Sequence, residues 1–162
     1  MSALEFPDDF YLRCIKLPGS NPGVGGMYAA AKDGVDNPII AAPQSPEFVD
    51  SEKWRFGPPD NSGNRQILFV PSGPQANIVL PTYGWTNLSE APGTDIVLTI
   101  DPSAYQIKQV GETDDGRPIL TIRPTGHLVG MDYYVGVEDD ILKIQGFDIR
   151  GSQEGRPGWI VY

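Results

Sequence analysis

Short apolar segments that carry an aromatic residue recur three times along this chain of 162 residues. The aromatics are Trp54, Tyr105 and Trp159, at spacings of 51 and 54 residues. A second apolar series keeps step with them: Leu12, Leu68 and Ile122. A fixed period of this size indicates one supersecondary unit that is repeated in the fold. Three such units of short strands predict an all-β fold, a β-trefoil barrel with three pseudo-repeats.

The apolar segments predict four short strands in each repeat, twelve in all, within a single domain over residues 1–162. The expected repeats cover 8–58, 64–112 and 117–162. Their strands are expected at 10–17, 26–31, 38–42 and 53–56, then 66–70, 77–80, 96–100 and 105–110, and finally 119–122, 133–137, 141–144 and 159–162. The segment 26–31 has some helix propensity, but it is short, uncapped and flanked by glycine, which favours a strand.

Turn-forming residues separate these segments. The chain contains 19 Gly and 16 Pro, spread along its length rather than gathered in a linker. Residues 60–64 (Asp-Asn-Ser-Gly-Asn) and 114–117 (Asp-Asp-Gly-Arg) follow the aromatic strand of the first and second repeats. Both predict hairpin connections with positive φ, which Gly, Asn and Asp adopt at low cost.

Charge and cysteine content exclude several classes of protein. The net charge of −9 argues against nucleic acid or an anionic membrane as a partner. The first residues contain no basic region followed by an apolar run, so no signal peptide is expected, and the protein is expected to be cytoplasmic. Cys14 is the only cysteine. Strand alternation places it on the same face as Phe10 and Leu12, which favours a buried and inert thiol.

The residues that catalysis or metal binding would require are scarce. His127 is the only histidine and lies in an expected loop, without an activated nucleophile near it in the sequence. One His and one Cys cannot form a zinc site without several carboxylates. The acidic runs 114–115 and 138–140 lack the ligand spacing of a calcium loop. We therefore expect a protein that is not an enzyme and has no cofactor or metal.

The glycine-rich segment 20–29 (Ser-Asn-Pro-Gly-Val-Gly-Gly-Met-Tyr-Ala) connects the first two expected strands. It lacks the Lys-Ser/Thr and the helix of a phosphate-binding loop. Proline stiffens such a connection, and glycines allow its backbone to approach another surface closely. The segment is therefore either a plain glycine-rich turn or a thin wedge that suits a narrow cleft.

Four segments together resemble one known family, the mycocypins, which are fungal inhibitors of cysteine proteases. The glycine-rich segment 21–29 resembles their first loop. Residues 9–13 (Asp-Phe-Tyr-Leu-Arg) resemble their opening strand, and 42–56 resemble a Pro-rich loop with its closing Trp strand. Residues 155–159 (Gly-Arg-Pro-Gly-Trp) resemble their carboxy-terminal Arg-Pro-x-Trp ending.

The resemblance implies a β-trefoil that blocks papain-like cysteine proteases with two neighbouring loops. The implied protease-binding residues are Pro22, Gly23, Val24, Gly25 and Gly26 in the first loop and Pro43, Gln44, Ser45, Pro46, Glu47 and Phe48 in the second. These loops would cover the catalytic cysteine without presenting a cleavable bond. Phe48 would be an apolar anchor, unless its ring folds back onto the barrel.

The resemblance also implies inhibition of legumain through a different loop, in which the protease reads an asparagine. Here that loop is 71–77, and Asn77 is its only asparagine. Asn77 could instead begin the next strand. Some relatives present a basic residue in this loop and inhibit trypsin. No Lys or Arg lies between residues 66 and 107, so trypsin inhibition is not expected.

The alternative function is that of a carbohydrate-binding β-trefoil lectin, because one fold hosts many functions. Ricin-type trefoil lectins carry Gln-x-Trp in each repeat. The corresponding first positions here are Glu52, Ser103 and Pro157. The motif is absent, although Tyr83, Trp85 and Tyr134 are expected to be exposed and could stack on a sugar.

Overall fold

The structure is a computed structural model that describes residues 6–19, 21–71, 82–126 and 129–162. It contains twelve strands and one short 3₁₀ helix, η1 (Val49–Ser51). The first four strands are β1 (Leu12–Lys16), β2 (Met27–Ala30), β3 (Ile40–Ala42) and β4 (Trp54–Phe56). The next four are β5 (Arg65–Phe69), β6 (Gly84–Asn87), β7 (Ile96–Thr99) and β8 (Ala104–Glu112). The last four are β9 (Pro118–Pro124), β10 (Met131–Glu138), β11 (Ile141–Asp148) and β12 (Pro157–Val161).

Six strands form a closed ring. The antiparallel pairs β4–β5, β5–β8, β8–β9, β9–β12 and β12–β1 account for five of its contacts. The ring is completed by a bridge between Phe10, just before β1, and Trp54 of β4. A closed ring removes unpaired strand edges, which otherwise promote aggregation.

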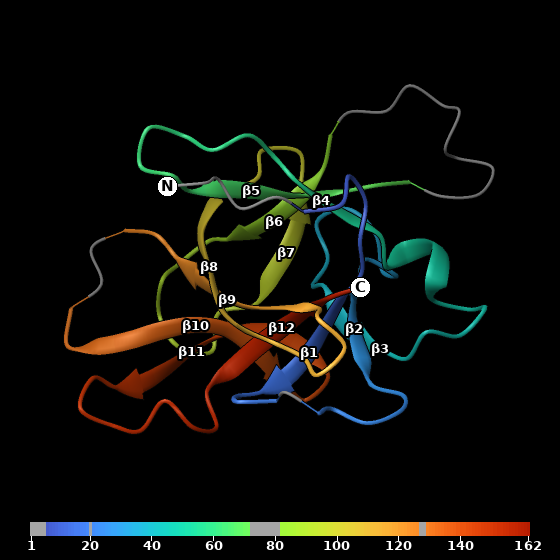
Figure 1. Cartoon of the computed structure of the whole chain (residues 1–162). Helices are drawn as coiled ribbons and strands as arrows, with labels where there is room; N and C mark the ends of the chain where they lie inside the picture. Colours follow the sequence, from blue (N-terminus) through green and yellow to red (C-terminus); the bar gives the residue numbers. More distant parts are fainter. Residues whose placement is uncertain (1–5, 20, 72–81, 127–128) are drawn as a thin grey trace.

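Three hairpins close one end of this barrel (Figure 1). They are β2–β3, β6–β7 and β10–β11, one from each repeat. Each hairpin touches the other two through the pairs Ile141–Ile40, Pro38–Val97 and Asp95–Lys143. Six barrel strands and three capping hairpins, related by a threefold repeat, are the β-trefoil that the sequence period predicts.

The three aromatics of the sequence repeat lie in the core. Trp54, Tyr105 and Trp159 are fully buried. The indole N–H of Trp54 donates to the carbonyl of Ala29, and that of Trp159 donates to the carbonyl of Val135, both at 2.9 Å. The first bond joins β4 to β2 within the first repeat, and the second joins β12 to β10 at the equivalent place in the third repeat. The packing therefore follows the pseudo-threefold symmetry.

Two predictions about side-chain exposure are wrong. Trp85 was expected at the surface, but it is fully buried, with its ring centroid 5.8 Å from that of Trp54 and 5.7 Å from that of Trp159. Tyr134 is also buried. In the second apolar series, Ile67 rather than Leu68 enters the core of β5. The corresponding strands of the other two repeats, β2 and β10, contribute the smaller Ala29 and Val135 to the core.

The expected strands otherwise agree with the structure at eleven positions, with shifts at their ends. The strand expected at 77–80 lies outside the described residues, and β6 was not predicted. Both hairpin turns have the expected positive φ, at Gly63 (82°) and Gly116 (85°). In the part of the chain that the structure describes, no helix is long and apolar enough to cross a membrane.

Candidate functional site

The two loops that the resemblance implies lie side by side. In the β2–β3 hairpin, Tyr28 pairs with Ala42. The chain therefore enters β2 from the loop 22–26 at the same end at which it leaves β3 into the loop 43–48. Both loops emerge at the lower right of Figure 1, below β2 and beside β3. Antiparallel register thus brings two segments about twenty residues apart to one edge of the molecule.

The first loop has a backbone that only glycine adopts easily. The φ angles of Gly23, Gly25 and Gly26 are 78°, 87° and 118°. A Cβ on Gly23 or Gly25 would meet no atom within 4 Å, because both face open space. A Cβ on Gly26 would overlap the guanidinium of Arg13. The loop is therefore thin at its tip and tightly packed at its base.

Arg13 of β1 holds this base. Its guanidinium donates to the carbonyl of Gly23 from Nη1 and to the carbonyl of Pro22 from Nη2, each at 3.0 Å. Nη1 also donates to the hydroxyl of Tyr162 at 3.2 Å. The arginine is 6% exposed, so these charge-assisted bonds are shielded from water. They fix two consecutive carbonyls of a loop that has few side chains of its own.

Tyr162 links the carboxy terminus to the same cluster. Its ring packs edge-on against that of Tyr28, with the centroids 5.8 Å apart. The guanidinium of Arg117 lies over the Tyr162 ring, 4.3 Å from its centroid. The first loop is therefore supported by β1, by the first residues of β2 and by the last residue of the chain.

The second loop forms a compact turn that leads into η1. The carbonyl of Ser45 accepts hydrogen bonds from the N–H groups of Phe48 (3.0 Å) and Val49 (2.9 Å). The carbonyl of Phe48 accepts two more, from the N–H and the hydroxyl of Ser51. Pro43, Gln44, Pro46 and Glu47 are exposed. The loop thus has a rigid backbone and an exposed outer edge.

The candidate apolar anchors differ in exposure. Phe48 is half-buried, and the ammonium of Lys32 lies 5.8 Å from its ring centroid. Lys32 also donates to the carbonyl of Glu47 at 3.3 Å. Val24, at the tip of the first loop, is 107% exposed. The sequence pattern favoured Phe48 as the anchor, but the most accessible apolar side chain of the two loops is Val24.

A buried carboxyl group lies where the second loop joins β4. Glu52 follows η1 directly and is 0% exposed, and neither of its carboxylate oxygens has a hydrogen-bond partner among the described residues. Burial raises the pKa of Glu52 to about 7. Sequence patterns do not predict this burial, since a glutamate is ordinarily solvated.

Three further residues were considered as functional candidates: Cys14, Asn77 and His127. Burial raises the pKa of the Cys14 thiol to about 12, which leaves it protonated and unreactive. Asn77 and His127 lie outside the described residues. Among the residues with described positions, no group of three or more His, Cys, Asp or Glu side chains could hold a metal ion.

Comparison with known proteins decides the family. A family model described as "Peptidase inhibitor clitocypin" matches residues 10–161. The chain belongs to this family. Clitocypin-2 of Clitocybe nebularis is 29% identical over 160 residues, covering 98% of this chain and 97% of the relative. Clitocypin-5 of the same fungus is 30% identical over 159 residues, with the same coverage.

Membership of the clitocypin family confirms the resemblance to fungal cysteine protease inhibitors and the prediction of a non-enzymatic protein. The fold has independent support. The crystal structure of ThreeFoil, a designed protein with threefold symmetry, matches with a TM-score of 0.59 at 11% identity. The match covers 96% of this chain and 98% of that chain, which confirms the threefold all-β architecture.

Proposed function

We propose that this clitocypin-like protein inhibits papain-like cysteine proteases by wedging the loops 22–26 and 43–48 into the active-site cleft. The observation that carries the proposal is the β2–β3 register, which sets both loops at one edge of the fold. Two short loops at one edge form a two-pronged surface that a cleft can receive.

The chemistry of the first loop suits occlusion rather than cleavage. Gly23 and Gly25 bear no side chain, and the space around them is open, so a protease can approach the backbone closely. Arg13 holds the carbonyls of Pro22 and Gly23. A peptide bond held in this way resists the extended conformation that a substrate takes. A loop that is already ordered also loses little entropy on binding.

The second loop adds a rigid exposed edge with its own internal hydrogen bonds. Pro43 and Pro46 restrict its backbone, and the turn at Ser45 is closed by two N–H groups. Its exposed residues, together with Val24 of the first loop, supply the contact surface. Fixed backbone and exposed side chains are what affinity without a large conformational change requires.

The lectin alternative loses its main support in the structure. Two of the three aromatics that could have stacked on a sugar, Trp85 and Tyr134, are buried. The third, Tyr83, packs against the core and is half-buried. A stacking platform requires an exposed aromatic face, and none of these three side chains presents one.

Parallel titration of a papain-like protease, legumain and trypsin with the purified protein tests the proposal. Tight inhibition of the papain-like enzyme with trypsin unaffected is the expected result. Absence of papain inhibition by a folded protein would overturn it. Circular dichroism and a cooperative unfolding transition establish folding in the same sample.

We further propose that legumain is inhibited through the loop 71–77, with Asn77 as the residue that the protease reads. The support is the family resemblance and the presence of a single asparagine in that loop. Asn77→Ala is expected to abolish legumain inhibition and to leave papain inhibition unchanged. Retained legumain inhibition would exclude Asn77, while loss of both activities would indicate misfolding, which the unfolding transition would reveal.

A further inference from the structure

A cavity of about 770 Å³ lies on the outer face of the β8–β9 hairpin, and no residue of the loops 22–26 and 43–48 lines it. β10, the turn after β1 and the segment 153–154 complete its walls. The volume is within the range of pockets that hold small organic molecules. Leu17, Pro18 and Ile119 give it an apolar side. The inhibitor proposal does not use this cavity.

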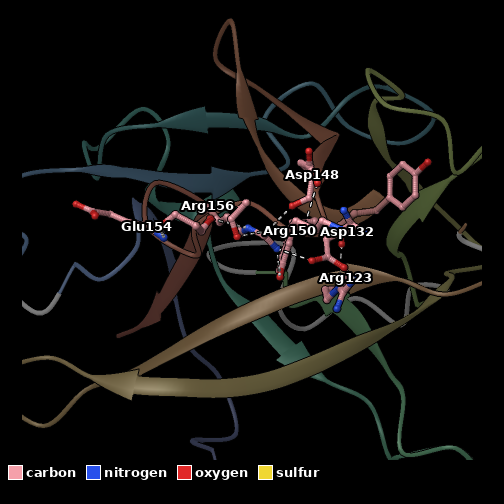
Figure 2. A network of polar contacts seen from close by, with 10 residues as sticks. Arg123, Asp132, Asp148, Arg150, Glu154 and Arg156 are labelled. Carbon is pink, nitrogen blue, oxygen red and sulfur yellow. Dashed lines mark hydrogen bonds and ion pairs between the residues drawn. The ribbon is translucent and has the colours of Figure 1, made fainter. Parts of the chain in front are cut away.

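A network of ionic contacts between Arg123, Asp132 and Arg156 lies next to the cavity (Figure 2). Arg123 and Asp132 line the cavity. Arg156 is 1% exposed and donates from Nη1 to Asp132 at 2.6 Å and to the Tyr134 hydroxyl at 3.1 Å. Its Nη2 donates to the carbonyl of Asp148 at 2.8 Å. The hydrogen bond from Arg156 holds the pKa of Asp132 below its usual value. Asp132 is therefore a fixed anion, and Arg156 is fully engaged in holding it.

Asp132 in turn orients a second arginine, which faces the cavity. Arg123 donates from Nη2 to Asp132 at 3.3 Å and from Nε to the carbonyl of Tyr133 at 3.0 Å. Its guanidinium lies 4.8 Å from the ring centroid of Tyr134. Nη1 forms no hydrogen bond with any described residue, and the side chain is 29% exposed. The guanidinium is thus held in place with free donors toward the cavity.

Two neighbours on the hairpin add further donors. Thr121 is 5% exposed, lines the cavity, and its hydroxyl forms no hydrogen bond within the described part of the chain. Lys108 pairs with Thr121 across the hairpin, two pairs along from Gln106 and Arg123. Lys108 forms no ion pair with a described residue. A guanidinium, an ammonium and a hydroxyl therefore converge on one part of the wall.

The acidic residues around the cavity do not neutralise the positive charge of Arg123 and Lys108. Both carboxylate oxygens of Asp132 are already occupied by Arg123 and Arg156. Glu112 lies at the far end of the hairpin, paired with Pro118. Glu154 is exposed, and Figure 2 shows its carboxylate pointing away from the arginine network. The deep wall thus offers unsatisfied donors, and the rim offers both donors and acceptors.

We propose that this cavity binds a small hydroxylated carboxylate of the size of a sugar acid. The carboxylate would lie against Arg123 and Thr121, with Lys108 at the entrance, because a guanidinium edge matches a carboxylate in geometry and charge. Hydroxyl groups both donate and accept, so they suit a rim that combines Gln106 and Gln153 with Glu112 and Glu154. The apolar side would face the C–H surface of the ligand.

Titration of ¹⁵N-labelled protein with sodium glucuronate, followed by NMR, tests the site. Saturable shifts of amides in residues 106–123 and 132–134 are expected, with a dissociation constant of about 1 mM or below. Glucose, acetate, inorganic phosphate and an acetylated dipeptide are titrated in parallel. Glucose tests whether the carboxylate is needed. Acetate and phosphate test whether the hydroxyl groups are needed. The dipeptide tests a carboxylate from a different class of molecule.

Three variants locate the binding. Arg123→Gln and Thr121→Val are expected to weaken glucuronate binding by about tenfold and several-fold, as lost charge-assisted and neutral hydrogen bonds would. Lys108→Gln is expected to weaken it by a few-fold and to make it less sensitive to salt. Glu47→Gln, at an exposed position that does not line the cavity, is the control and should bind as the unmodified protein does. If Arg123→Gln does not fold, Thr121→Val and Lys108→Gln still show whether glucuronate binds at this wall of the cavity.

Shifts that do not saturate with glucuronate would overturn the proposal, as would equal binding of glucose or equal affinity in Lys108→Gln and Thr121→Val. Tighter binding of the dipeptide than of glucuronate would overturn the assignment of a hydroxylated ligand. Phosphate binding alone would show an anion site without the proposed ligand class.

Discussion

The side chain of Arg13 holds the carbonyl of Gly23 at 3.0 Å, and this contact joins the barrel wall to the base of the first loop. A second hydrogen bond, from Nη2 of Arg13 to the carbonyl of Pro22, fixes the preceding residue as well. A loop built of glycines would otherwise sample many conformations. The rigidity needed for occlusion is therefore supplied by a strand residue that points away from the core.

Replacing Arg13 should loosen the loop more than it unfolds the domain. Arg13→Met keeps much of the buried hydrocarbon but removes the bonds to Pro22, Gly23 and Tyr162. We expect papain inhibition to weaken by about tenfold or more, since hydrogen bonds to charged groups contribute about 1.5–3 kcal/mol each. Tyr162→Phe removes one of the three bonds and should cost only a few-fold.

The measurement is the inhibition constant against papain, with unfolding midpoints for each variant. Arg55→Met, on the exposed surface of β4, is the control and should leave the constant unchanged. An Arg13→Met protein that inhibits as well as the unmodified one would show that the clamp does not matter for inhibition.

Val24 should contribute to binding but not to stability. The side chain is 107% exposed, so Val24→Ser is expected to change the free energy of unfolding by less than about 0.5 kcal/mol. Papain inhibition should weaken by about tenfold or more, because burying a valine at an interface yields about 1.5–3 kcal/mol. Val35→Ser, at the opposite end of the β2–β3 hairpin, is the matched control. Equal inhibition by both variants would remove Val24 from the contact surface.

Glu52 should make stability fall as the pH rises. Burial raises its pKa from 4.5 to about 7, so the folded state binds the proton more tightly than the unfolded chain does. The resulting stabilisation is fully present below about pH 4.5 and is lost as the pH rises to about 7, with a change on the order of 3 kcal/mol.

Glu52→Gln tests this linkage, because a neutral amide does not titrate. The variant is expected to lose the downward slope between these pH values and to exceed the unmodified protein in stability at pH 8. Urea unfolding across this pH range measures the effect, with the exposed Glu47→Gln as the control. Identical slopes in the unmodified protein and in Glu52→Gln would contradict the account.

Two of the core tryptophans, Trp85 and Trp159, should differ in how much stability the protein loses when each is replaced by Phe. The Trp159 indole donates to the carbonyl of Val135, whereas the buried indole N–H of Trp85 has no partner in the part of the chain that the structure describes. Trp159→Phe leaves a buried acceptor unpaired, which costs about 1–3 kcal/mol. Trp85→Phe instead removes an unsatisfied donor, so it should be the milder change. Calorimetry gives both values, and a larger loss for Trp85→Phe would show that packing volume dominates.

Much of the fold could be predicted because it depends on features that are local in sequence. The aromatic period marks the repeats, and the glycines at 63 and 116 mark the hairpins. The loop 22–26 stood out for the same reason. The β6 strand was not predicted because Gly84 and Asn87 disfavour a strand, only Trp85 and Thr86 favour one, and the segment follows a proline-rich stretch. Its strand conformation depends on pairing with β7 along four residue pairs.

The supports of the loops could not be predicted, because they are made by residues distant in sequence. Arg13 looks like any outward-facing strand residue, and its partner Tyr162 is 149 residues away. Glu52 lies between η1 and β4 and is buried, although nothing in the local sequence indicates burial. The Arg123–Asp132–Arg156 network likewise joins β9, β10 and the residue just before β12. Such contacts emerge only once the barrel has closed.

The most direct test of the central claim compares two glycines in the same backbone conformation. Gly25 (φ 87°) lies in the first loop, and Gly63 (φ 82°) lies in the β4–β5 turn; a Cβ on either would meet nothing within 4 Å. Gly25→Trp and Gly63→Trp therefore impose similar strain, about 1–2 kcal/mol. The inhibition constant against papain is measured for both. We predict a rise of at least about a hundredfold for Gly25→Trp, equivalent to roughly 2.7 kcal/mol, and none for Gly63→Trp. Unchanged inhibition by a folded Gly25→Trp protein would contradict the wedge mechanism.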